Sequence, residues 1–207
     1  MWEELFQLYL VTSLLFHVIR NKKMEGWQWL YPPESFEFIG NDGVKIVTKD
    51  STDYWQRTHY GFRNDNGHFL YKKIKGDFVI SAETNFDSTT LYDQCGLYAR
   101  LDEDNWVKTS TEYENEKVSH MGAVVTNLGY SDWSKREIDA NIKRVFYQMK
   151  RIGNDFEIWV SLDGVEYKEI RVAHFHKEAP ELMVGVYACS PKRGGFTCQI
   201  TNIKITQ

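Results

Sequence analysis

Apolar and polar residues alternate along most of the chain after residue 24, with the period of two that is typical of β-strands. The alternation is clearest between residues 156 and 162, where Phe156, Ile158, Val160 and Leu162 take turns with Glu157, Trp159 and Ser161. Turn sequences rich in Asn, Asp and Gly separate such segments at residues 41–43, 66–67, 76–77, 153–155 and 163–164. The pattern predicts strands at residues 35–39, 44–48, 53–60, 78–86, 95–101, 106–113, 118–126, 144–152, 156–162, 182–190 and 195–206.

This set of strands indicates the fold class. Helical periodicity after residue 24 is limited to one short turn expected near residues 134–138. Many short strands without a repeated unit favour two packed sheets or a closed barrel, and at this length a jelly-roll sandwich fits better. The sequence therefore predicts an all-β fold in one domain that covers residues 24–207.

Residues 1–23 differ in character from the rest of the chain. Their apolar run from residue 5 to residue 19 is shorter than the ~20 residues needed to cross a bilayer, and polar residues interrupt it. Two glutamates precede the run and basic residues follow it, which is the reverse of a secretory signal. We interpret the segment as peripheral to the domain, either a helix or an extension of the gene model, with a signal anchor as the alternative.

The amino-acid composition limits the kinds of ligand and partner that the protein is expected to bind. Aromatic residues make up 15% of the chain, including seven Trp and twelve Tyr, which is more than the core needs. The formal net charge of −4 argues against a nucleic-acid partner, because phosphate binding needs a basic surface. The three cysteines, Cys95, Cys189 and Cys198, lack the spacing of a metal site. We therefore predict that all three are buried, reduced thiols and that the protein is cytoplasmic. A Cys189–Cys198 disulfide is the alternative.

Residues 91–113 are predicted to form a β-hairpin whose two faces differ in chemistry. One face is small or apolar and suits a core. Because side chains two residues apart share a face, the other face combines polar and aromatic groups, namely Gln94, Tyr98, Arg100, Trp106, Lys108 and Glu112. Large aromatic residues are unusual on a plain solvent face, so this face is predicted to be the floor of a binding surface. A half-covered sheet surface is the alternative.

Several separated blocks of the sequence resemble those of one protein family, and they occur in the same order. They are TDYWQRTHYGFRNDNGHFLY, GDF, YDQCGLYARLDEDNWVKTSTEYE, VVTNLGYSDWS and VGVYACSP. The family consists of concanavalin A-like domains of unknown function related to the "regulation of enolase" protein, and the resemblance extends from residue 26 to the C-terminus. It implies a jelly-roll of two curved antiparallel sheets whose concave sheet holds the ligand. The family brings no established catalytic residues.

In such a fold, two further segments contribute to the concave face. The strand expected at residues 53–60 places Asp53, Trp55, Arg57 and His59 there, although an anchor in the core is the alternative role for Trp55. A loop at residues 131–134 would bring Trp133 to one end. The predicted ligand-binding residues are Trp55, Arg57, His59, Gln94, Tyr98, Arg100, Trp106, Lys108, Glu112 and Trp133.

Carboxylates and histidines are the candidates for catalysis and metal binding. Glu112 shares a side of its strand with Glu114 and Glu116, which superficially matches the paired carboxylates of a retaining glycosidase. A turn expected at residues 115–117 places the last two in solvent, so Glu112 is expected to pair with Lys108 and orient a ligand. The pair His174 and His176 lacks a third ligand. The acidic turn at residues 102–105 needs no ion as a hairpin turn, and calcium binding there is the alternative. No metal or cofactor is predicted.

Two functions of different classes follow. The first is a non-catalytic, lectin-like module that holds a small polar ligand such as a sugar on its concave face. The second is a glycoside-active enzyme that uses Glu112 with Asp53 or Asp93. The resemblance adds a third, a regulatory partner of a metabolic enzyme. Carboxylates facing each other across an open cleft would favour the enzyme, whereas Glu112 paired to Lys108 or Arg100 would favour binding. Neither nucleic acid nor a membrane is expected as a partner.

Overall fold

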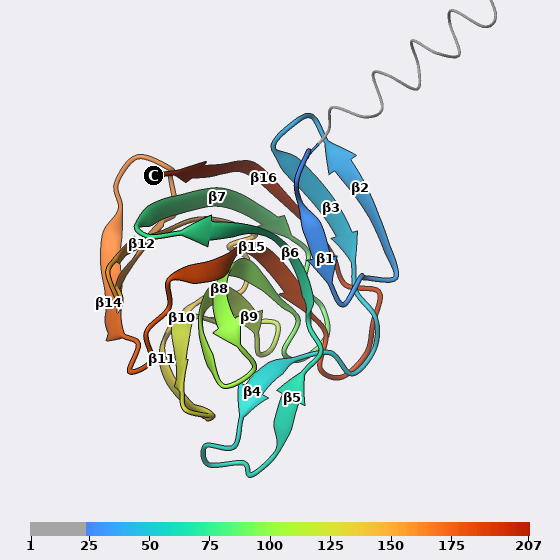
Figure 1. Cartoon of the computed structure of the whole chain (residues 1–207). Coiled ribbons are helices and arrows are strands. Elements are labelled where there is room, and N and C mark those ends of the chain that lie inside the picture. The colour runs from blue at the N-terminus through green and yellow to red at the C-terminus, as the bar shows by residue number, and fades with distance from the viewer. Residues whose placement is uncertain (1–23) are drawn as a thin grey trace, which may run out of the picture.

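The structure, a computed structural model, describes residues 24–207 and arranges them as two seven-stranded antiparallel sheets (Figure 1). The inner sheet has the strand order β1 (Gln28–Leu30), β6 (His68–Lys75), β15 (Glu181–Cys189), β8 (Gln94–Asp102), β9 (Asn105–Tyr113), β10 (Val118–Asn127) and β11 (Tyr130–Asp139). The outer sheet arches over it with the order β14 (Lys168–His174), β13 (Asp155–Ser161), β12 (Arg144–Ile152), β7 (Phe78–Phe86), β16 (Thr197–Thr206), β3 (Gly43–Val47) and β2 (Ser35–Ile39). A hairpin of β4 (Tyr54–Gln56) and β5 (Arg63–Asp65) lies against the far side of the inner sheet. The predicted all-β sandwich is confirmed.

The main hydrophobic core fills the space between the two sheets. In β7, buried and half-buried residues alternate from Phe78 to Phe86, so that one face of the strand packs inward. Leu97 of β8 and Val107 of β9 are fully buried in the same core from the inner sheet. Burial of each large apolar side chain contributes about 1.5–3 kcal/mol, which makes this layer the main source of stability.

A second, smaller core lies on the concave face of the inner sheet, under the β4–β5 hairpin. Tyr54 of the hairpin packs against Tyr98, Trp106 and Tyr187 of the sheet, and Trp55 belongs to the same cluster. The rings of Tyr54 and Tyr98 are 4.6 Å apart between centroids. Because the hairpin covers this region, β8 and β15 are buried on both faces along most of their length.

Gly96 and Gly122 of the inner sheet occupy positions where no side chain fits. A Cβ atom on Gly96 would lie 1.9 Å from the carbonyl oxygen of Thr109, and one on Gly122 would lie 2.1 Å from that of Ser134. Both glycines flank Ser110, with which each is paired across the sheet. Glycine therefore permits the close backbone approach between β8 and β9 and between β10 and β11.

Most predicted strands are confirmed, and β2, β7 and β12 begin and end at the predicted residues. The strand expected at residues 53–60 is wrong in length. β4 ends at Gln56, and the positive φ angles of Arg57 (55°) and His59 (64°) are incompatible with a strand. The helical turn at residues 134–138 and the loop at residues 131–134 are also wrong, because both segments lie within β11.

The sequence pattern does not predict β1, β5, β6, β11 and β14. Three of these, β1, β11 and β14, are edge strands of the two large sheets. Their residues are mostly exposed or half-buried, so their sequences show little apolar alternation. The three cysteines are free and buried, as predicted, and the alternative disulfide is not formed. Within residues 24–207, no helix is long and apolar enough to cross a membrane. The predictions for residues 1–23 lie outside the described residues.

Candidate functional site

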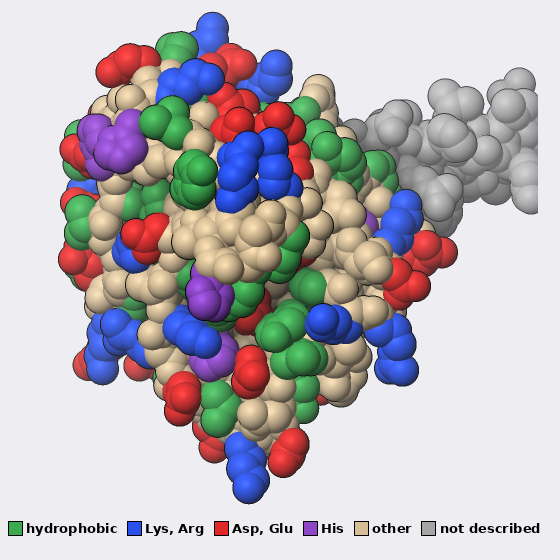
Figure 2. Space-filling view, turned by 90° about the horizontal axis from the view of Figure 1, so that it is seen from below, with side chains coloured by type: hydrophobic (Ala, Val, Ile, Leu, Met, Phe, Trp, Pro, Cys, Tyr) green, Lys and Arg blue, Asp and Glu red, His purple; other side chains and the backbone are tan. Residues whose placement is uncertain are grey.

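A pocket of about 320 Å³ opens on the concave face of the inner sheet, beside the β4–β5 hairpin. Its floor comes from Gln94 of β8 and from Lys108 and Glu112 of β9. The hairpin forms one wall, β10 and β11 form the other, and the segments before β8 and after β15 form the rim. Figure 2 views the molecule from this side and shows a hollowed surface among hydrophobic, basic and histidine side chains.

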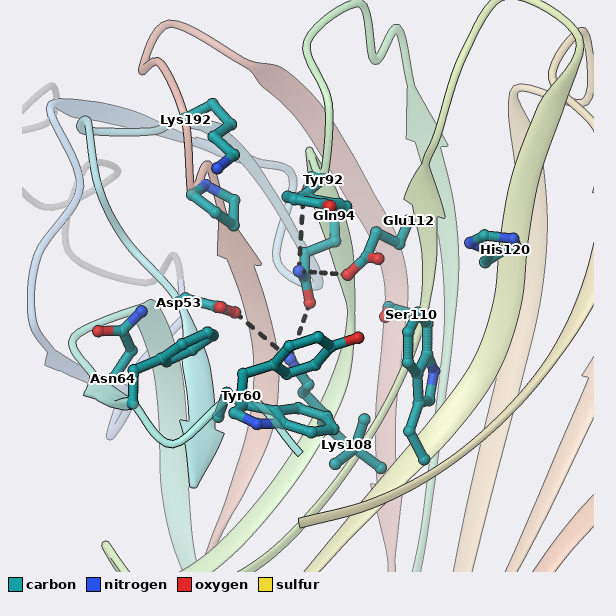
Figure 3. Close-up of a pocket in the computed structure, with 15 residues that line it drawn as sticks. Asp53, Tyr60, Asn64, Tyr92, Gln94, Lys108, Ser110, Glu112, His120 and Lys192 are labelled. Carbon is teal, nitrogen blue, oxygen red and sulfur yellow. Dashed lines mark hydrogen bonds and ion pairs between the residues drawn. The ribbon is translucent and has the colours of Figure 1, made fainter. Parts of the chain in front are cut away.

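Four polar side chains follow one another along the floor (Figure 3). Asp53, just before β4, lies 3.8 Å from the Lys108 ammonium between Oδ1 and Nζ. Lys108 Nζ donates a hydrogen bond of 2.9 Å to Gln94 Oε1, and Gln94 Nε2 donates one of 2.8 Å to Glu112 Oε2. The predicted Lys108–Glu112 pair is therefore wrong, because Gln94 stands between the two and Asp53 takes the ion pair instead.

The Gln94 amide has no hydrogen-bonding capacity left for a ligand. Its oxygen accepts from Lys108 Nζ and, at 3.0 Å, from the hydroxyl of Tyr187. Its nitrogen donates to Glu112 and, at 3.3 Å, to the carbonyl oxygen of Tyr92. An amide has two acceptor sites and two donor protons, so all four are used inside the protein. Gln94 thus fixes the positions of Lys108 and Glu112.

The environment of Glu112 favours its protonated form. Burial raises the pKa of Glu112 to about 8, and the negative charge of Asp53 adds to the rise while Lys108 opposes it. A carboxyl group with this pKa is mostly neutral near pH 7 and can donate a hydrogen bond. Nearby His120 has a lowered pKa through burial and the charge of Lys135, so it is mostly neutral as well.

Aromatic side chains form the walls above this polar floor. Trp55 and Trp133 approach each other edge to face with 6.4 Å between ring centroids. Tyr60 and Phe62, from the loop between β4 and β5, stack at 5.7 Å and are largely exposed at the mouth. The Lys135 ammonium lies 4.4 Å from the centroid of the Trp133 ring. The pocket thus combines indole walls with charged hydrogen-bonding groups at the bottom.

The structure brings together five of the ten predicted site residues: Trp55, Gln94, Lys108, Glu112 and Trp133 line the pocket. The other five lie elsewhere. Tyr98 and Trp106 are fully buried under the hairpin, and Arg100 forms a two-point ion pair with Asp65 of β5. Arg57 donates a 2.7 Å hydrogen bond to the carbonyl oxygen of Gly129, and the exposed His59 packs edge to face against Tyr60.

Several lining residues were missed in the sequence. They are Tyr60, Phe62, Asn64, Tyr92, Ser110, His120, Val124, Pro191 and Lys192. The strand alternation that selects Lys108 and Glu112 also places Ser110 on the same face, so this one was available from the pattern. Those in the connecting segments depend on tertiary packing. Within residues 24–207, no group of three or more His, Cys, Asp or Glu side chains is arranged to hold a metal ion.

Comparison with solved structures first places the fold in a class. The carbohydrate-binding module CBM66 from Bacillus subtilis superposes with a TM-score of 0.55 at 14% identity, covering 89% of this chain and 97% of that chain. The GH43 protein BlXynB from Bacillus licheniformis has a TM-score of 0.66 at 15% identity, covering 87% of this chain and 36% of that chain. At these identities the likeness shows the fold alone, a β-sandwich similar to those of the two proteins.

Sequence comparison then gives the family. Residues 29–207 match the family described as "Protein of unknown function (DUF1349)", and the chain belongs to it. "Regulation of enolase protein 1" from Saccharomyces cerevisiae is 30% identical over 188 residues, which cover 90% of this chain and 92% of that protein. A functionally unknown protein from Saccharomyces cerevisiae, known from its crystal structure, has a TM-score of 0.82 at 29% identity, covering 89% of this chain and 97% of that chain. The resemblance noted in the sequence is confirmed.

Proposed function

We propose that this protein is a non-catalytic saccharide-binding module that holds one sugar residue in the pocket on its concave face. The observation that carries the proposal is the hydrogen-bonded row of Asp53, Lys108, Gln94 and Glu112 beneath indole walls. The volume of about 320 Å³ is near the lower end of the ~300–1,000 Å³ that ligand pockets span, which suits a single small ligand. The fold shared with a carbohydrate-binding module supports the same function.

The two kinds of side chain match the two kinds of surface on a sugar. A sugar ring has apolar C–H faces and hydroxyl groups around its edge. Trp55 and Trp133 would contact the C–H faces, since aromatic rings supply flat apolar surface. Lys108 and the free oxygens of Asp53 and Glu112 would exchange hydrogen bonds with the hydroxyl groups, and charged partners make such bonds stronger.

The proposal is tested by calorimetric titration of the full chain with a panel of neutral and acidic mono- and oligosaccharides. Binding of at least one sugar is expected, and Trp133→Ala should weaken it by about tenfold or more through loss of the aromatic wall. Trp159→Ala is the matched control, because Trp159 lies on β13 of the outer sheet, away from the pocket. Failure of every sugar to bind, or equal effects of the two substitutions, would overturn the proposal.

A glycoside-active enzyme is the second candidate, and the raised pKa of Glu112 favours it, because a general acid must keep its proton near neutral pH. Its partner would be Asp53. Asp93 lies outside the pocket, where it accepts hydrogen bonds from Ser190 and the Thr90 N–H. We favour binding because the Asp53 carboxylate is already paired with the Lys108 ammonium inside the protein. Release of the aglycone from aryl glycosides, abolished by Glu112→Gln, would instead support the enzyme.

A regulatory role toward enolase is the third candidate, and it rests on the name of the yeast relative that is 30% identical over 90% of this chain. A regulator of this kind would bind the enzyme directly or change its activity. Titration of purified enolase with the full chain measures both effects. Unchanged enolase kinetics together with the absence of a complex in gel filtration would exclude this role.

A further inference from the structure

We infer that the pocket selects a saccharide that carries a carboxylate, such as a hexuronate, over the corresponding neutral hexose. This inference rests on the proposed function and names its ligand class. It follows from which hydrogen-bond donors of the pocket remain available once the contacts within the protein are satisfied. Three of the donors that line the cavity carry the inference, because they can meet a negative charge: Glu112, Lys108 and Lys192.

Gln94 determines how Glu112 faces the ligand. Its amide N–H donates to Glu112 Oε2, so Oε2 must act as an acceptor. The other oxygen, Oε1, takes part in no hydrogen bond within residues 24–207. A proton on Glu112 therefore resides at Oε1, on a side chain that lines the pocket. In this form the carboxyl group donates a hydrogen bond and carries no charge.

Two lysines add donors to the same space. The Lys108 ammonium donates to Gln94 and lies 3.8 Å from Asp53, which leaves at least one N–H for a ligand. Lys108 is only 3% exposed, so its charge is poorly screened by water. Lys192 lies exposed at the rim, with Nζ 5.5 Å from the centroid of the Tyr92 ring (Figure 3). A group rich in acceptors and negatively charged is the best complement to these three donors.

The charge balance of the pocket also favours a negatively charged ligand. With Glu112 neutral, two lysines outnumber the single carboxylate of Asp53. Burial is the main cause of the raised pKa of Glu112, about 8. The charged and titratable groups that face it from the surrounding strands and segments are Lys108, Asp53, Lys135, Glu114, His120, Tyr92, Tyr187 and Cys189. Of these, His120 is mostly neutral, and the three last-named groups have raised pKa values and stay protonated near pH 7.

The affinity of the pocket for a hexuronate should therefore depend on pH. Below the pKa of Glu112 its carboxyl group donates to the bound carboxylate. As pH rises through about 8, Glu112 loses the proton and becomes a second anion facing the ligand. Affinity for the hexuronate should therefore fall in this range. Affinity for a neutral hexose should change much less, because it brings no charge to be repelled.

The test is calorimetric titration of the full chain with the methyl glycosides of glucuronate and glucose at about pH 6 and about pH 9, where the glucuronate is ionised throughout. We expect the glucuronide to bind about 10–100-fold more tightly than the glucoside at the lower pH, as for a hydrogen bond to a charge. Glu112→Gln keeps a donor and carries no charge, so it should preserve the preference and remove the pH dependence. Lys108→Met should abolish the preference, and Lys204→Ala on β16 is the control for general charge effects.

The outcomes separate the two proposals. Equal affinity for the two glycosides at both pH values would overturn the preference for a carboxylate and leave the saccharide-binding function standing. A pH dependence that persists in Glu112→Gln would overturn the role of Glu112 as the titrating donor to the bound carboxylate. Binding of no saccharide in the panel would overturn both. If Lys108→Met does not fold, Glu112→Gln still decides the result, because an amide replaces the carboxyl group without a change in size.

Discussion

Replacement of Glu112 by glutamine should change how the stability of the protein depends on pH, whether or not a ligand is known. In the folded protein, burial raises the pKa of Glu112 from the ordinary value of 4.5 to about 8. The folded state therefore holds the proton more tightly than the unfolded chain. The stability gained in this way is complete below the pKa of the unfolded chain and is lost as pH rises through about 8. The amide side chain of the Glu112→Gln variant cannot ionise, so the variant lacks this loss.

The magnitude follows from the two pKa values. Each unit of difference corresponds to about 1.4 kcal/mol, and the linkage relation gives a loss of ~3 kcal/mol between about pH 5.5 and about pH 9. Because the side chain is half-buried and borders an open pocket, water reduces this value, and we expect about 1–2 kcal/mol. The Gln94 hydrogen bond survives in the variant, since an amide oxygen accepts as a carboxyl oxygen does.

Urea unfolding of the two proteins at a series of pH values measures the difference directly. The free energies of unfolding should converge at the acidic end, diverge as pH rises from about 5 to about 8, and stay apart above that range, with Glu112→Gln the more stable protein. The other titrating groups are common to both proteins and cancel in the difference. Two curves that remain parallel from about pH 5.5 to about pH 9 would refute the assignment of a raised pKa to Glu112.

Four further predictions concern the fold. Asp65→Ala leaves Arg100 buried without its ion-pair partner and should lower the free energy of unfolding, measured with urea, by about 3–5 kcal/mol. Its control, Glu103→Ala, removes an exposed ion pair with Arg63 and should lower the same free energy by less than about 1 kcal/mol. Gly122→Ala forces a methyl group against Ser134 and should lower the melting temperature strongly, while Gly61→Ala meets no atom within 4 Å and should cost only backbone strain, about 1 kcal/mol. The thiols should react with a maleimide only after unfolding, as judged by mass spectrometry, because all three are buried. Removal of residues 1–23 should leave the melting curve unchanged, since the family match begins at residue 29.

Each of these predictions has a contradicting result. Equal costs for Asp65→Ala and Glu103→Ala would show that the Arg100 ion pair does not hold the hairpin. A Gly122→Ala variant as stable as Gly61→Ala would show that β10 and β11 separate easily. Rapid labelling of a native thiol would show that the small core opens, and a broadened or lower melting transition after truncation would place residues 1–23 in the domain.

The strands that the sequence predicts best are those with one face in the core and the other in solvent. β7 and β12 alternate for nine residues each, and their predicted ends agree with the structure. The sequence does not predict β11, and the reason is physical. It is an edge strand held by backbone pairing to β10, and mostly polar residues from Tyr130 to Asp139 leave no apolar alternation to detect. Pairing between backbones depends on the neighbouring strand and not on side-chain pattern, so periodicity cannot show it.

The register of the central hairpin was predictable for a different reason. The short turn after Asp102 fixes the pairing, and Arg100 faces Trp106 while Gln94 faces Glu112. Alternation then decides which face each side chain takes. It does not decide what lies on top of that face, because the covering hairpin comes from residues 54–65, far away in sequence. The sequence pattern therefore gives the same role to all six residues of this face. In the structure, Gln94, Lys108 and Glu112 line the pocket, whereas Tyr98, Arg100 and Trp106 are buried beneath the hairpin.

The β4–β5 hairpin divides the concave face into two regions with different roles. Near Arg100, the hairpin supplies Asp65 and Tyr54, and the sheet beneath it becomes a second core. Toward Glu112 the hairpin ends, and the same face opens as a pocket with Asp53 and Trp55 at its border. The hairpin thus both anchors itself on the sheet and sets one wall of the site. If the pocket binds a ligand as proposed, the loop of residues 57–62, which carries Tyr60 and Phe62 at the mouth, would limit the size of the ligand, and Gln94 would determine which donors meet it.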